Sequence, residues 1–422
     1  MTMVNKVYIM FDAIIIGAGP SGLMCAITLG SYKKKVLLIE KNEMIGKKMR
    51  LTGGGRCNIT NLKDVHTFIN SLPIKSGRFL YHALTNFGPK DIWDFFEKRG
   101  VPLKVEDNDR VFPKSNRALD FLEVFEQEIR NNNITLLTST EVTDLKITDN
   151  IKTVYTTKGA YTTENVVIAT GGLSYPHTGS TGFGHNIARK FNHTVTEIYP
   201  TESPLISYDE VITSKILQGL SFKGITITLL DENEKPLKSQ TGDLLITHFG
   251  LSGPASLRLS QFAYHYLKHH KEALVTIDFL PEQSIEHLKH TLVEYKQTEK
   301  TKTLKNILKN FIPERLSEYL VSQLKLTNQK MSDVSKHVLN DLSLLLKNFP
   351  IKVHGVKPLE VAFVTGGGIS LSELNPKSME SKLIPGLYFV GEVCDLHGYT
   401  GGYNLTIALS TGYTCGMYIA QK

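Results

Sequence analysis

The period of hydrophobic and polar positions changes several times along the chain, and each change predicts a different element. Continuous apolar runs at residues 11–16 and 35–40 predict two buried strands, and the segment between them, up to about residue 30, predicts a helix. A strand–helix–strand unit of this length predicts a parallel sheet with a right-handed crossover. Apolar runs at residues 165–169 and 386–391 predict two further buried strands.

The middle of the chain follows other patterns. Residues 62–130 predict mixed helix, with an amphipathic stretch at 119–129, and a strand pair is expected near 134–137 and 141–147. From 193 to 280, short alternating segments such as 224–229 and 273–278 predict an antiparallel β-module. Residues 281–347 keep helical spacing, and from about 351 the α/β pattern returns. A nucleotide domain interrupted by an insertion follows from this order.

Composition narrows the class of protein. Hydrophobic residues make up 41% and charged residues 21% of the 422 residues, so the chain can bury a large core. No apolar run is long enough to predict a membrane span, and the N-terminus lacks a secretory signal. Only four cysteines occur, without C-x-x-C, which excludes a disulfide scaffold and fits a reducing cytosol. We expect a cytoplasmic protein. Residues 1–9 carry no comparable signal, and Met10 could be the natural start.

The turn after the first strand, residues 17–22, reads G-x-G-x-x-G and predicts a dinucleotide site. Gly17 permits the tight turn, Gly19 lets a pyrophosphate approach the backbone, and Gly22 lets the helix pack close to the strand. The N-terminus of the helix supplies N–H groups and partial positive charge for the phosphates. Glu40 closes the second strand, where an acidic side chain binds ribose hydroxyls.

The other end of the chain favours FAD over NAD. The strand at 386–391 ends in Gly-Glu, and Asp395 follows three residues after Glu392. This segment resembles the second flavin-contacting segment of two-dinucleotide-fold flavoproteins, in which an acidic residue meets the ribityl chain. Residues 401–404, Gly-Gly-Tyr-Asn, then open the last helix, whose N-terminus would stabilise an anionic reduced flavin. Fumarate-reductase-like enzymes share some of these features but not the Gly-Gly-Tyr-Asn ending or the insert.

Four further motifs narrow the family: Leu-Thr-Gly-Gly-Gly-Arg-Cys-Asn at 51–58, a glycine-rich loop at 170–182, Thr-His-Phe-Gly-Leu-Ser-Gly-Pro at 247–254 and Val-Thr-Gly-Gly-Gly-Ile at 364–369. In this order they resemble the bacterial BaiN-type NAD(P)/FAD-dependent oxidoreductases, also labelled aminoacetone-oxidase-like flavoproteins. The resemblance implies an α/β, Rossmann-like two-dinucleotide-binding FAD domain with an inserted β-barrel module and a small helical module. The FAD domain would comprise residues 1–192 and 356–422, the barrel 193–280 with a continuation near 348–355, and the helical insert 281–347.

The resemblance also implies a chemistry. Members of the family are linked to reduction of a carbon–carbon double bond conjugated to a carbonyl, in bile-acid enones in one branch and in a uridine of large-subunit ribosomal RNA, giving dihydrouridine, in another. Reduced flavin N5 would give hydride to the β-carbon, and an acid would protonate the α-carbon. No second G-x-G-x-x-G follows a strand, so NAD(P)H would dock transiently as electron donor, or another donor would serve.

The motifs and the resemblance together predict which residues hold FAD. These are Gly17, Ala18, Gly19, Pro20, Ser21, Gly22, Glu40, Lys41, Lys48, Gly53, Gly54, Gly55, Arg56, Cys57, Asn58, Val142, Ala169, Thr170, Gly171, Gly391, Glu392, Asp395, Gly401, Gly402, Tyr403 and Asn404.

Five residues are candidates for catalysis: Arg56, Cys57, Tyr175, His177 and His248. Arg56 could hold the substrate carbonyl or the flavin, or else clamp a phosphate or the backbone. Cys57 could donate a proton, or simply pack on the flavin. Tyr175 and His177 lie on a glycine-rich loop that could face the flavin ring. His248 lies in the β-module, where an insert could close over the site; the alternative is a histidine whose hydrogen bonds are satisfied within its own loop. His397 and Tyr399 are expected near the flavin. The scattered histidines indicate no metal site.

Three functions remain open at this stage. The net charge of +7 and a helical insert containing Lys302, Lys305 and Lys309 favour a ribosomal RNA dihydrouridine synthase that docks on phosphates. A small-molecule enone reductase or amine oxidase is the second interpretation, with the basic charge incidental. A flavin-bound binding protein without turnover is the third. The oligomeric state is not predicted.

Overall fold

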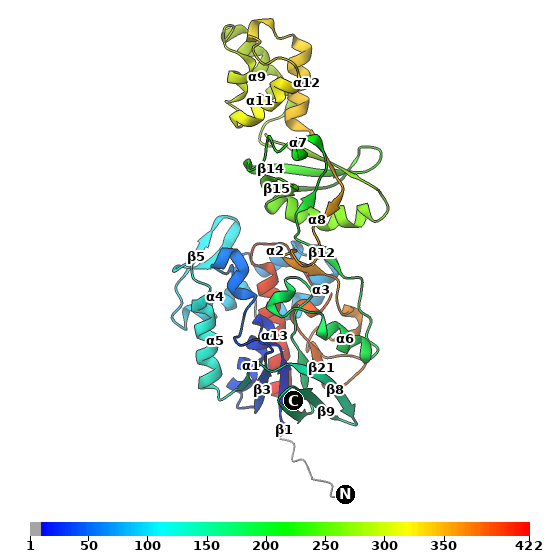
Figure 1. Ribbon diagram of the computed structural model, residues 1–422. Coiled ribbons are helices and arrows are strands. Elements are labelled where there is room, and N and C mark those ends of the chain that lie inside the picture. The colour runs from blue at the N-terminus through cyan, green and yellow to red at the C-terminus, as the bar shows by residue number, and fades with distance from the viewer. Residues whose placement is uncertain (1–9) are drawn as a thin grey trace, which may run out of the picture. The chain divides into compact units, whose positions relative to one another are not determined.

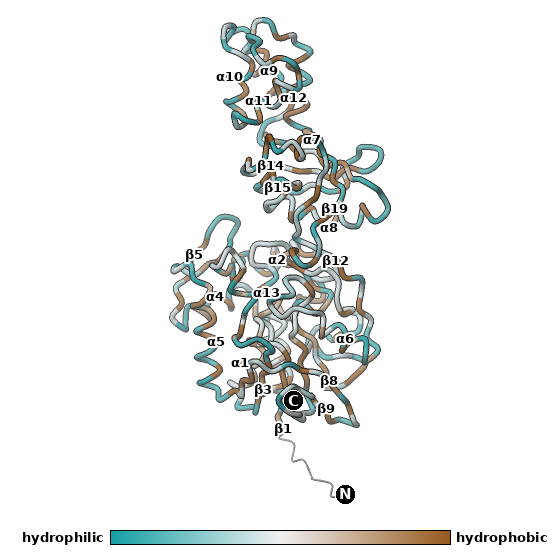
Figure 2. Tube along the Cα trace, viewed as in Figure 1, coloured by the Kyte–Doolittle hydropathy of each residue, from teal (hydrophilic) through white to brown (hydrophobic). Residues whose placement is uncertain are grey.

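The computed structural model describes residues 10–422, and the chain forms two compact units (Figure 1). Among the described residues, unit 1 comprises residues 10–199 and Val364–Lys422, and unit 2 comprises Pro200–Phe363. The two domain boundaries predicted from the sequence, 192/193 and 355/356, each lie a few residues before the corresponding boundary between the two units. Each unit has its own apolar cluster. Figure 2 shows hydrophobic stretches within each unit. Residues 1–9, where the sequence predicts no element, lie outside the described residues.

A parallel sheet of five strands forms the centre of unit 1. Its order is β21 (Leu387–Phe389), β11 (Val166–Ile168), β2 (Ala13–Ile16), β3 (Val36–Ile39) and β7 (Thr135–Leu137). All four strands predicted from apolar runs are present in it. The first four strands are buried throughout, because helices cover both faces of a parallel sheet and leave no face for polar residues.

Two helices from opposite ends of the chain pack together in this unit. Helix α1 (Pro20–Ser31) follows the first strand, and α13 (Tyr403–Gln421) ends the chain. A Cβ added to Gly412 would lie 2.2 Å from the backbone oxygen of Ser21, so glycine permits the close approach of the two helices. Both helices have buried residues around most of their circumference, as expected for central elements.

The remaining strands of unit 1 form small sheets. Strands β1, β10, β9 and β8 form one sheet, and β4, β6 and β5 form another. The predicted strand pair therefore divides between two sheets, with β7 in the parallel sheet and β8 in the four-stranded one. Their bounds are β1 (Met10–Phe11), β4 (Thr60–Asn61), β5 (Leu103–Glu106), β6 (Arg110–Pro113), β8 (Val142–Thr148), β9 (Ile151–Thr156) and β10 (Gly159–Thr163).

Helices cover the rest of unit 1, and the amphipathic helix predicted at 119–129 is α5. They are α2 (Val65–Asn70), α3 (Ile74–Asn86), α4 (Pro89–Glu97), α5 (Leu119–Asn131) and α6 (Phe183–Lys190), with 3-10 turns at Met49–Gly55, Pro176–Thr178 and Gly391–Val393. A two-stranded sheet of β12 (Tyr199–Thr201) and β20 (Val364–Gly366) lies where the chain leaves unit 1 and returns to it.

Unit 2 contains a sheet of seven strands. Its order is β18 (Phe349–Val353), β17 (Ala273–Asp278), β14 (Ser221–Leu230), β15 (Pro236–Thr247), β16 (Gly250–Ser252), β13 (Leu205–Ile206) and β19 (Gly355–Val356). The two outermost strands are separated in sequence by His354 alone, so the sheet must curl strongly to bring its edges to one segment. Such curvature is what a barrel-like module needs, and the description as a barrel stays a prediction.

Helices complete unit 2. The alternating pattern missed α8 (Pro254–Leu267), which packs on β14 and β15. The segment predicted as helical contains α9 (Ile285–Thr298), α10 (Leu304–Leu308), α11 (Glu314–Gln323) and α12 (Lys336–Lys347), and α7 (Glu210–Thr213) is a single turn.

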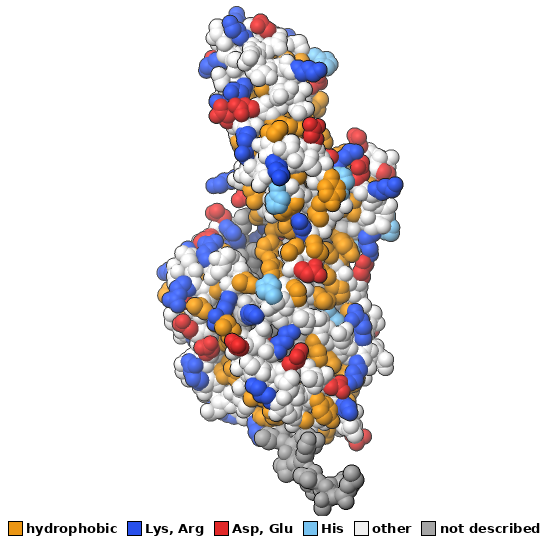
Figure 3. All heavy atoms as spheres, viewed as in Figure 1, with side chains coloured by type: hydrophobic (Ala, Val, Ile, Leu, Met, Phe, Trp, Pro, Cys, Tyr) orange, Lys and Arg blue, Asp and Glu red, His pale blue; other side chains and the backbone are white. Residues whose placement is uncertain are grey.

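Figure 3 shows Lys and Arg side chains interspersed with Asp and Glu on the face in view. No helix in the described part of the chain is long and apolar enough to span a bilayer.

Candidate active site

The carboxyl ends of the parallel strands bring four predicted segments to one edge of the sheet. Strand β2 runs into the turn at 17–22, β3 into Glu40, β11 into residues 169–171, and β21 into residues 391–392. In the parallel ladders, Ile16 pairs with Ile39 and with Ile168, and Ile168 pairs with Phe389. Because these ends are in register, residues from four distant parts of the sequence share one site, as ligand-binding edges of α/β sheets do.

The three motif glycines occupy the environments that a dinucleotide turn requires. A Cβ on Gly22 would lie 1.9 Å from the backbone oxygen of Gly17, and one on Gly17 would lie 2.5 Å from that of Ala169. A Cβ on Gly19, by contrast, would meet no atom within 4 Å. Gly17 and Gly22 therefore allow close packing, while Gly19 leaves an open backbone face at the N-terminus of α1, which suits a pyrophosphate.

The Glu40 carboxylate is buried beside this turn. Its Oε2 accepts a hydrogen bond from the backbone N–H of Ala18 at 2.9 Å, and its Oε1 accepts from the backbone N–H and the side-chain amide of Asn42 at 2.9 and 2.6 Å. Three donors thus hold the carboxylate in place at the end of β3. Its position next to Ala18 is that of a ribose-binding acid in a dinucleotide turn.

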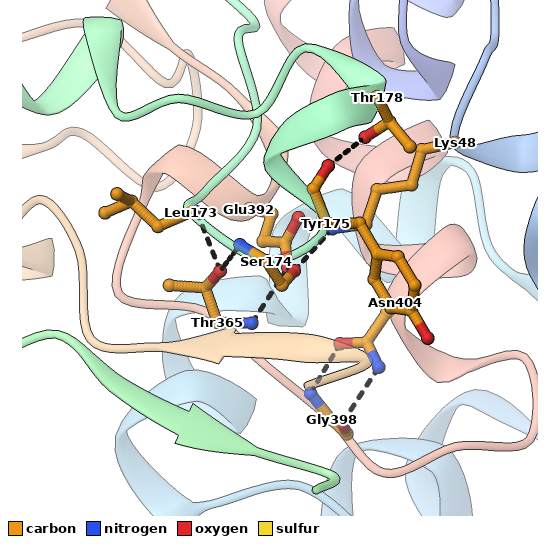
Figure 4. Close-up of polar contacts among 9 residues, drawn as sticks. All are labelled: Lys48, Leu173, Ser174, Tyr175, Thr178, Thr365, Glu392, Gly398 and Asn404. Atoms are coloured by element: carbon orange, nitrogen blue, oxygen red, sulfur yellow. Dashed lines mark hydrogen bonds and ion pairs between the residues drawn. The ribbon is translucent and has the colours of Figure 1, made fainter. Parts of the chain in front are cut away.

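A second carboxylate, Glu392, is the centre of a polar network shown in Figure 4. The Nζ of Lys48 lies 2.9 Å from its Oε2 and donates to the Oγ of Ser174 at 2.6 Å. The backbone N–H of Thr365 and the Oγ of Ser174 donate to its Oε1 at 2.9 and 3.3 Å. Burial by itself would raise the pKa of Glu392, but the charge of Lys48 and these donors hold the pKa below its usual value.

The same network fixes the glycine-rich loop at 170–182. The Oγ1 of Thr365 accepts from the backbone N–H groups of Leu173 and Ser174, so the strand β20 holds the loop directly. Thr365 and Ser174 are not among the predicted cofactor residues. Ser174 lies in the loop motif at 170–182 and Thr365 in the motif at 364–369, but no local sequence pattern predicted hydrogen bonds between the two motifs.

The far end of this loop is tied to the segment after β3. Lys41 donates to the Oγ1 of Thr181 at 3.0 Å, and the side-chain amide of Asn42 donates to the backbone oxygen of Thr178 at 3.0 Å. Together with the bond from Lys48 to Ser174, three contacts hold the loop over residues 41–48. The predicted cofactor residues Lys41 and Lys48 therefore also position the loop.

Tyr175 and His177 lie on this loop, with their rings in edge-to-face contact and the centroids 5.6 Å apart. Tyr175 has a left-handed backbone (φ 51°, ψ 59°), which is uncommon for a residue with a bulky side chain. Its side chain is half-buried, and burial raises the pKa of its hydroxyl. His177 is exposed.

Arg56 already has a carboxylate partner. Its guanidinium lies 2.9 Å from Glu106 and 4.2 Å from the centre of the Phe112 ring. Lys104 also contacts Glu106, at 3.0 Å. The Nε of Arg56 also donates to the backbone oxygen of Gly53 at 3.4 Å. A substrate carbonyl would therefore have to share the guanidinium with Glu106.

Cys57 is fully buried behind the triple-glycine turn, with a left-handed backbone (φ 60°). Burial, opposed by a hydrogen bond with Thr52, raises the pKa of its thiol to about 12. Burial outweighs the lowering by Thr52, so the pKa of the thiol is raised rather than lowered overall. Gly53, Gly54 and Gly55 all have positive φ, and the side chain of Asn58 accepts from the backbone N–H of Val111.

The segment before α13 is held by its own side chains. The amide of Asn404 accepts from the backbone N–H of Gly398 and donates to its oxygen, both at 2.9 Å (Figure 4). The ring of Tyr403 packs on Phe68, with the centroids 4.7 Å apart. His397 is buried, and its ring lies edge-to-face with Tyr199 at 6.0 Å. Gly401 and Gly402 both adopt positive φ at the start of the helix.

Two further predicted residues belong to other elements. His248 belongs to unit 2, on the turn between β15 and β16, where it is exposed and contacts the ring of Phe249. Val142 is the buried first residue of β8. In the described part of the chain, no three His, Cys, Asp or Glu side chains form a group that could hold a metal ion.

The fold and the edge of the sheet define a protein with a dinucleotide-binding domain of the kind found in flavin-dependent oxidoreductases. The family model described as the HI0933-like protein Rossmann domain matches residues 11–418, so the chain belongs to that family. This confirms the family predicted from the motifs, and with it the prediction of an oxidoreductase.

Two curated relatives are similar to this chain over nearly the full length of both sequences. The chain is 31% identical over 415 residues to the ribosomal RNA dihydrouridine synthase of Escherichia coli, covering 98% of this chain and 99% of the relative. It is 28% identical to the 3-dehydro-bile acid delta(4,6)-reductase of Clostridium scindens, covering 97% and 98%. Among solved structures, a flavocytochrome c3 fumarate reductase matches with a TM-score of 0.51 and 16% identity, covering 98% of this chain and 78% of that one. The last match concerns the fold alone.

Proposed function

We propose that this protein binds FAD at the edge of the parallel sheet and reduces a carbon–carbon double bond conjugated to a carbonyl, with a uridine of large-subunit ribosomal RNA as substrate. The observation that carries the cofactor assignment is the contrast between Gly19, whose backbone face is open, and Gly17 and Gly22, which are tightly packed. Glu40 would hold the ribose next to Ala18, and the N-terminus of α1 would face the pyrophosphate.

Bound FAD would supply the hydride, with NAD(P)H proposed as its transient source. The chain itself must position the substrate and provide a proton. The Lys48–Glu392 network keeps the loop of Tyr175 in place. A tyrosine hydroxyl is protonated at neutral pH, and burial raises the pKa of Tyr175 further, so the group is present in its acid form. A strained backbone kept at a site suggests a function for the residue. We therefore favour the Tyr175 hydroxyl over the fully buried Cys57 thiol as the proton donor.

The RNA substrate is supported by the 31% identity to a dihydrouridine synthase over nearly the whole of both chains and by the net charge of +7. A uridine can reach such a site only when it is unpaired or flipped out of its helix. The similarity to a bile-acid reductase, at 28% identity, favours the second candidate, a small-molecule enone reductase. The amine-oxidase alternative has no such support, and a binding protein without turnover does not fit the oxidoreductase family.

The decisive experiment maps dihydrouridine in large-subunit ribosomal RNA from cells with and without the gene. We expect one modified position to be lost and to return with the wild-type protein but not with the Gly19→Ala variant. Identical RNA from both strains would refute the RNA substrate. Reoxidation of the reduced flavin by conjugated carbonyl compounds would then test the second candidate.

A further inference from the structure

Helices α2 and α3 of unit 1 carry a polar surface without carboxylates. Between Val65 and Lys90 the sequence contains no aspartate or glutamate, although the chain has 41 of them among its 422 residues. The acid just before this stretch, Asp64, caps α2 and accepts hydrogen bonds from the backbone N–H and the hydroxyl of Thr67. A polyanion that approached these helices would meet no carboxylate from within them.

The outer side of α3 combines a cation with an aromatic ring. Arg78, Tyr81 and Thr85 are three and four residues apart, so they lie on one face of the helix, and all three are exposed. The Tyr81 ring is 61% exposed, which is high for a large aromatic side chain. Among the ion pairs of the described residues, none involves Arg78. The guanidinium is thus available for a phosphate.

Helix α2, which packs on α3, also exposes polar side chains. His66 and Asn70 are exposed, and their side chains lie 3.1 Å apart. Phe68, on the inner side of α2, packs on the ring of Tyr403, and the Nζ of Lys63 lies 5.9 Å from the centre of the same ring. Since Tyr403 begins α13, the surface borders the segment proposed to face the flavin.

In the described part of the chain, the lysines of the helical insert, unlike Arg78, form ion pairs. Lys302 pairs with Glu299 and Lys305 with Glu318, each at 3.0 Å, and Lys309 pairs with Glu314. Each of the three charges that the sequence analysis assigned to RNA docking is therefore compensated by a neighbouring carboxylate. Ion-paired lysines release fewer counterions from a nucleic acid than free ones do.

We propose that the exposed face of α2 and α3, around Arg78 and Tyr81, docks the RNA substrate. Arg78 contacts a phosphate, and Tyr81 stacks on an unpaired base near the target uridine. The proposal rests on the RNA function proposed above and names the surface that this function would use. Helix α3 packs on α13, the helix whose N-terminus is proposed to face the flavin and where the flipped base must arrive.

The test measures binding of an in vitro transcript of large-subunit ribosomal RNA to the full-length flavin-loaded protein at several salt concentrations. Arg78→Glu should raise the Kd about tenfold and lower the slope of log K against log salt by about 1. Tyr81→Ala should raise the Kd on the order of tenfold with the slope unchanged. Lys309→Glu is the control for charge, and Tyr208→Ala, which removes an aromatic ring that is 69% exposed in unit 2, is the control for an exposed ring. Flavin absorbance and Tm verify that each variant folds.

Weaker binding of both α3 variants, with the two controls like the wild type, would establish the surface. If the α3 variants bind RNA and restore dihydrouridine in cells as the wild type does, the docking surface is wrong while the RNA function stands. Equal losses in Arg78→Glu and Lys309→Glu would also overturn it, because the effect would then be one of overall charge. If the wild type neither binds the RNA nor changes its dihydrouridine, both proposals fail.

Discussion

Lys48 and Glu392 form an ion pair of 2.9 Å although 344 residues separate them in the sequence. The pair joins the segment after β3 to the segment after β21, and through Ser174 and Thr365 it also holds the glycine-rich loop. Both side chains are about three-quarters buried, so neither charge is well solvated without the other.

Glu392→Gln should therefore destabilise unit 1. The variant leaves the Lys48 ammonium without its carboxylate in a partly buried position, and we expect a loss of about 2 kcal/mol in the free energy of unfolding together with weaker flavin retention. Urea unfolding and the flavin absorbance after gel filtration measure the two effects. Asp94→Asn, which breaks the exposed pair with Lys90, should cost less than about 1 kcal/mol. Equal effects in the two variants would contradict the role assigned to Glu392.

The motif glycines make a prediction that separates folding from cofactor binding. Gly19→Ala adds a methyl group to an open face, so its Tm without flavin should match that of the flavin-free wild type, while the protein should be purified without yellow colour. Gly22→Ala forces a Cβ to within 1.9 Å of the backbone oxygen of Gly17. This variant should lose the flavin and also have a Tm lower by several degrees. Retention of FAD in Gly19→Ala would show that the pyrophosphate does not lie against this backbone.

Tyr175→Phe should remove the proton donor while keeping the ring. We expect turnover to fall by about 10²- to 10⁴-fold, with flavin content and Tm unchanged. Cys57→Ala is the comparison, because the Cys57 thiol is fully buried, whereas Tyr175 is half-buried on the loop. Single-turnover reoxidation of the reduced flavin by substrate gives the chemical step for both. A larger loss in Cys57→Ala at unchanged stability would reverse the assignment.

The thiols themselves can be tested by alkylation. The described structure buries all four cysteines, and burial raises the pKa of Cys57 to about 12 and that of Cys394 and Cys415 above the usual range. Iodoacetamide at pH 8 should modify none of them in the native protein and all four in guanidinium, as counted by mass spectrometry. Rapid modification of Cys57 in the native state would show that the site opens around it.

Stability should fall at mildly acidic pH because of His193. Its ring is buried between Glu373 and Ser381, at 3.0 and 2.9 Å, and burial lowers its pKa in the folded state below 6.5 despite Glu373. The unfolded chain therefore binds a proton first as the pH falls below about 6.5, and stability decreases from there down to the folded pKa. His185, whose pKa is also lowered by burial, adds a second contribution.

The matching experiment compares the dependence of Tm on pH between 7.5 and 5 in the wild type, His193→Asn and His337→Asn. His337 is 85% exposed on its side chain, so its replacement should leave the dependence as it is. His193→Asn should reduce it. If the dependence of Tm on pH is unchanged in His193→Asn, another group binds the proton that lowers the stability.

Several features of the site follow from local sequence. The G-x-G-x-x-G turn, the buried strands that precede Gly17 and Glu40, and the helix that begins at Tyr403 were all predicted, because steric demands on glycine and the period of apolar positions act over a few residues. Helix α8 was missed. Its Leu259 and Ala263 are buried in the core of unit 2, and the surrounding strand pattern obscured the change of period.

Local sequence is enough to predict the class of domain, the G-x-G-x-x-G turn and the candidate residues Tyr175 and His177 of the glycine-rich loop, because these depend on residues adjacent along the chain. The ion pairs, by contrast, follow from how the folded chain brings distant segments together. The tertiary structure pairs Lys48 with Glu392, Arg56 with Glu106 and Lys302 with Glu299, and leaves Arg78 without an ion pair among the described residues. Charge compensation and burial depend on groups brought together from distant segments, so no local pattern encodes them.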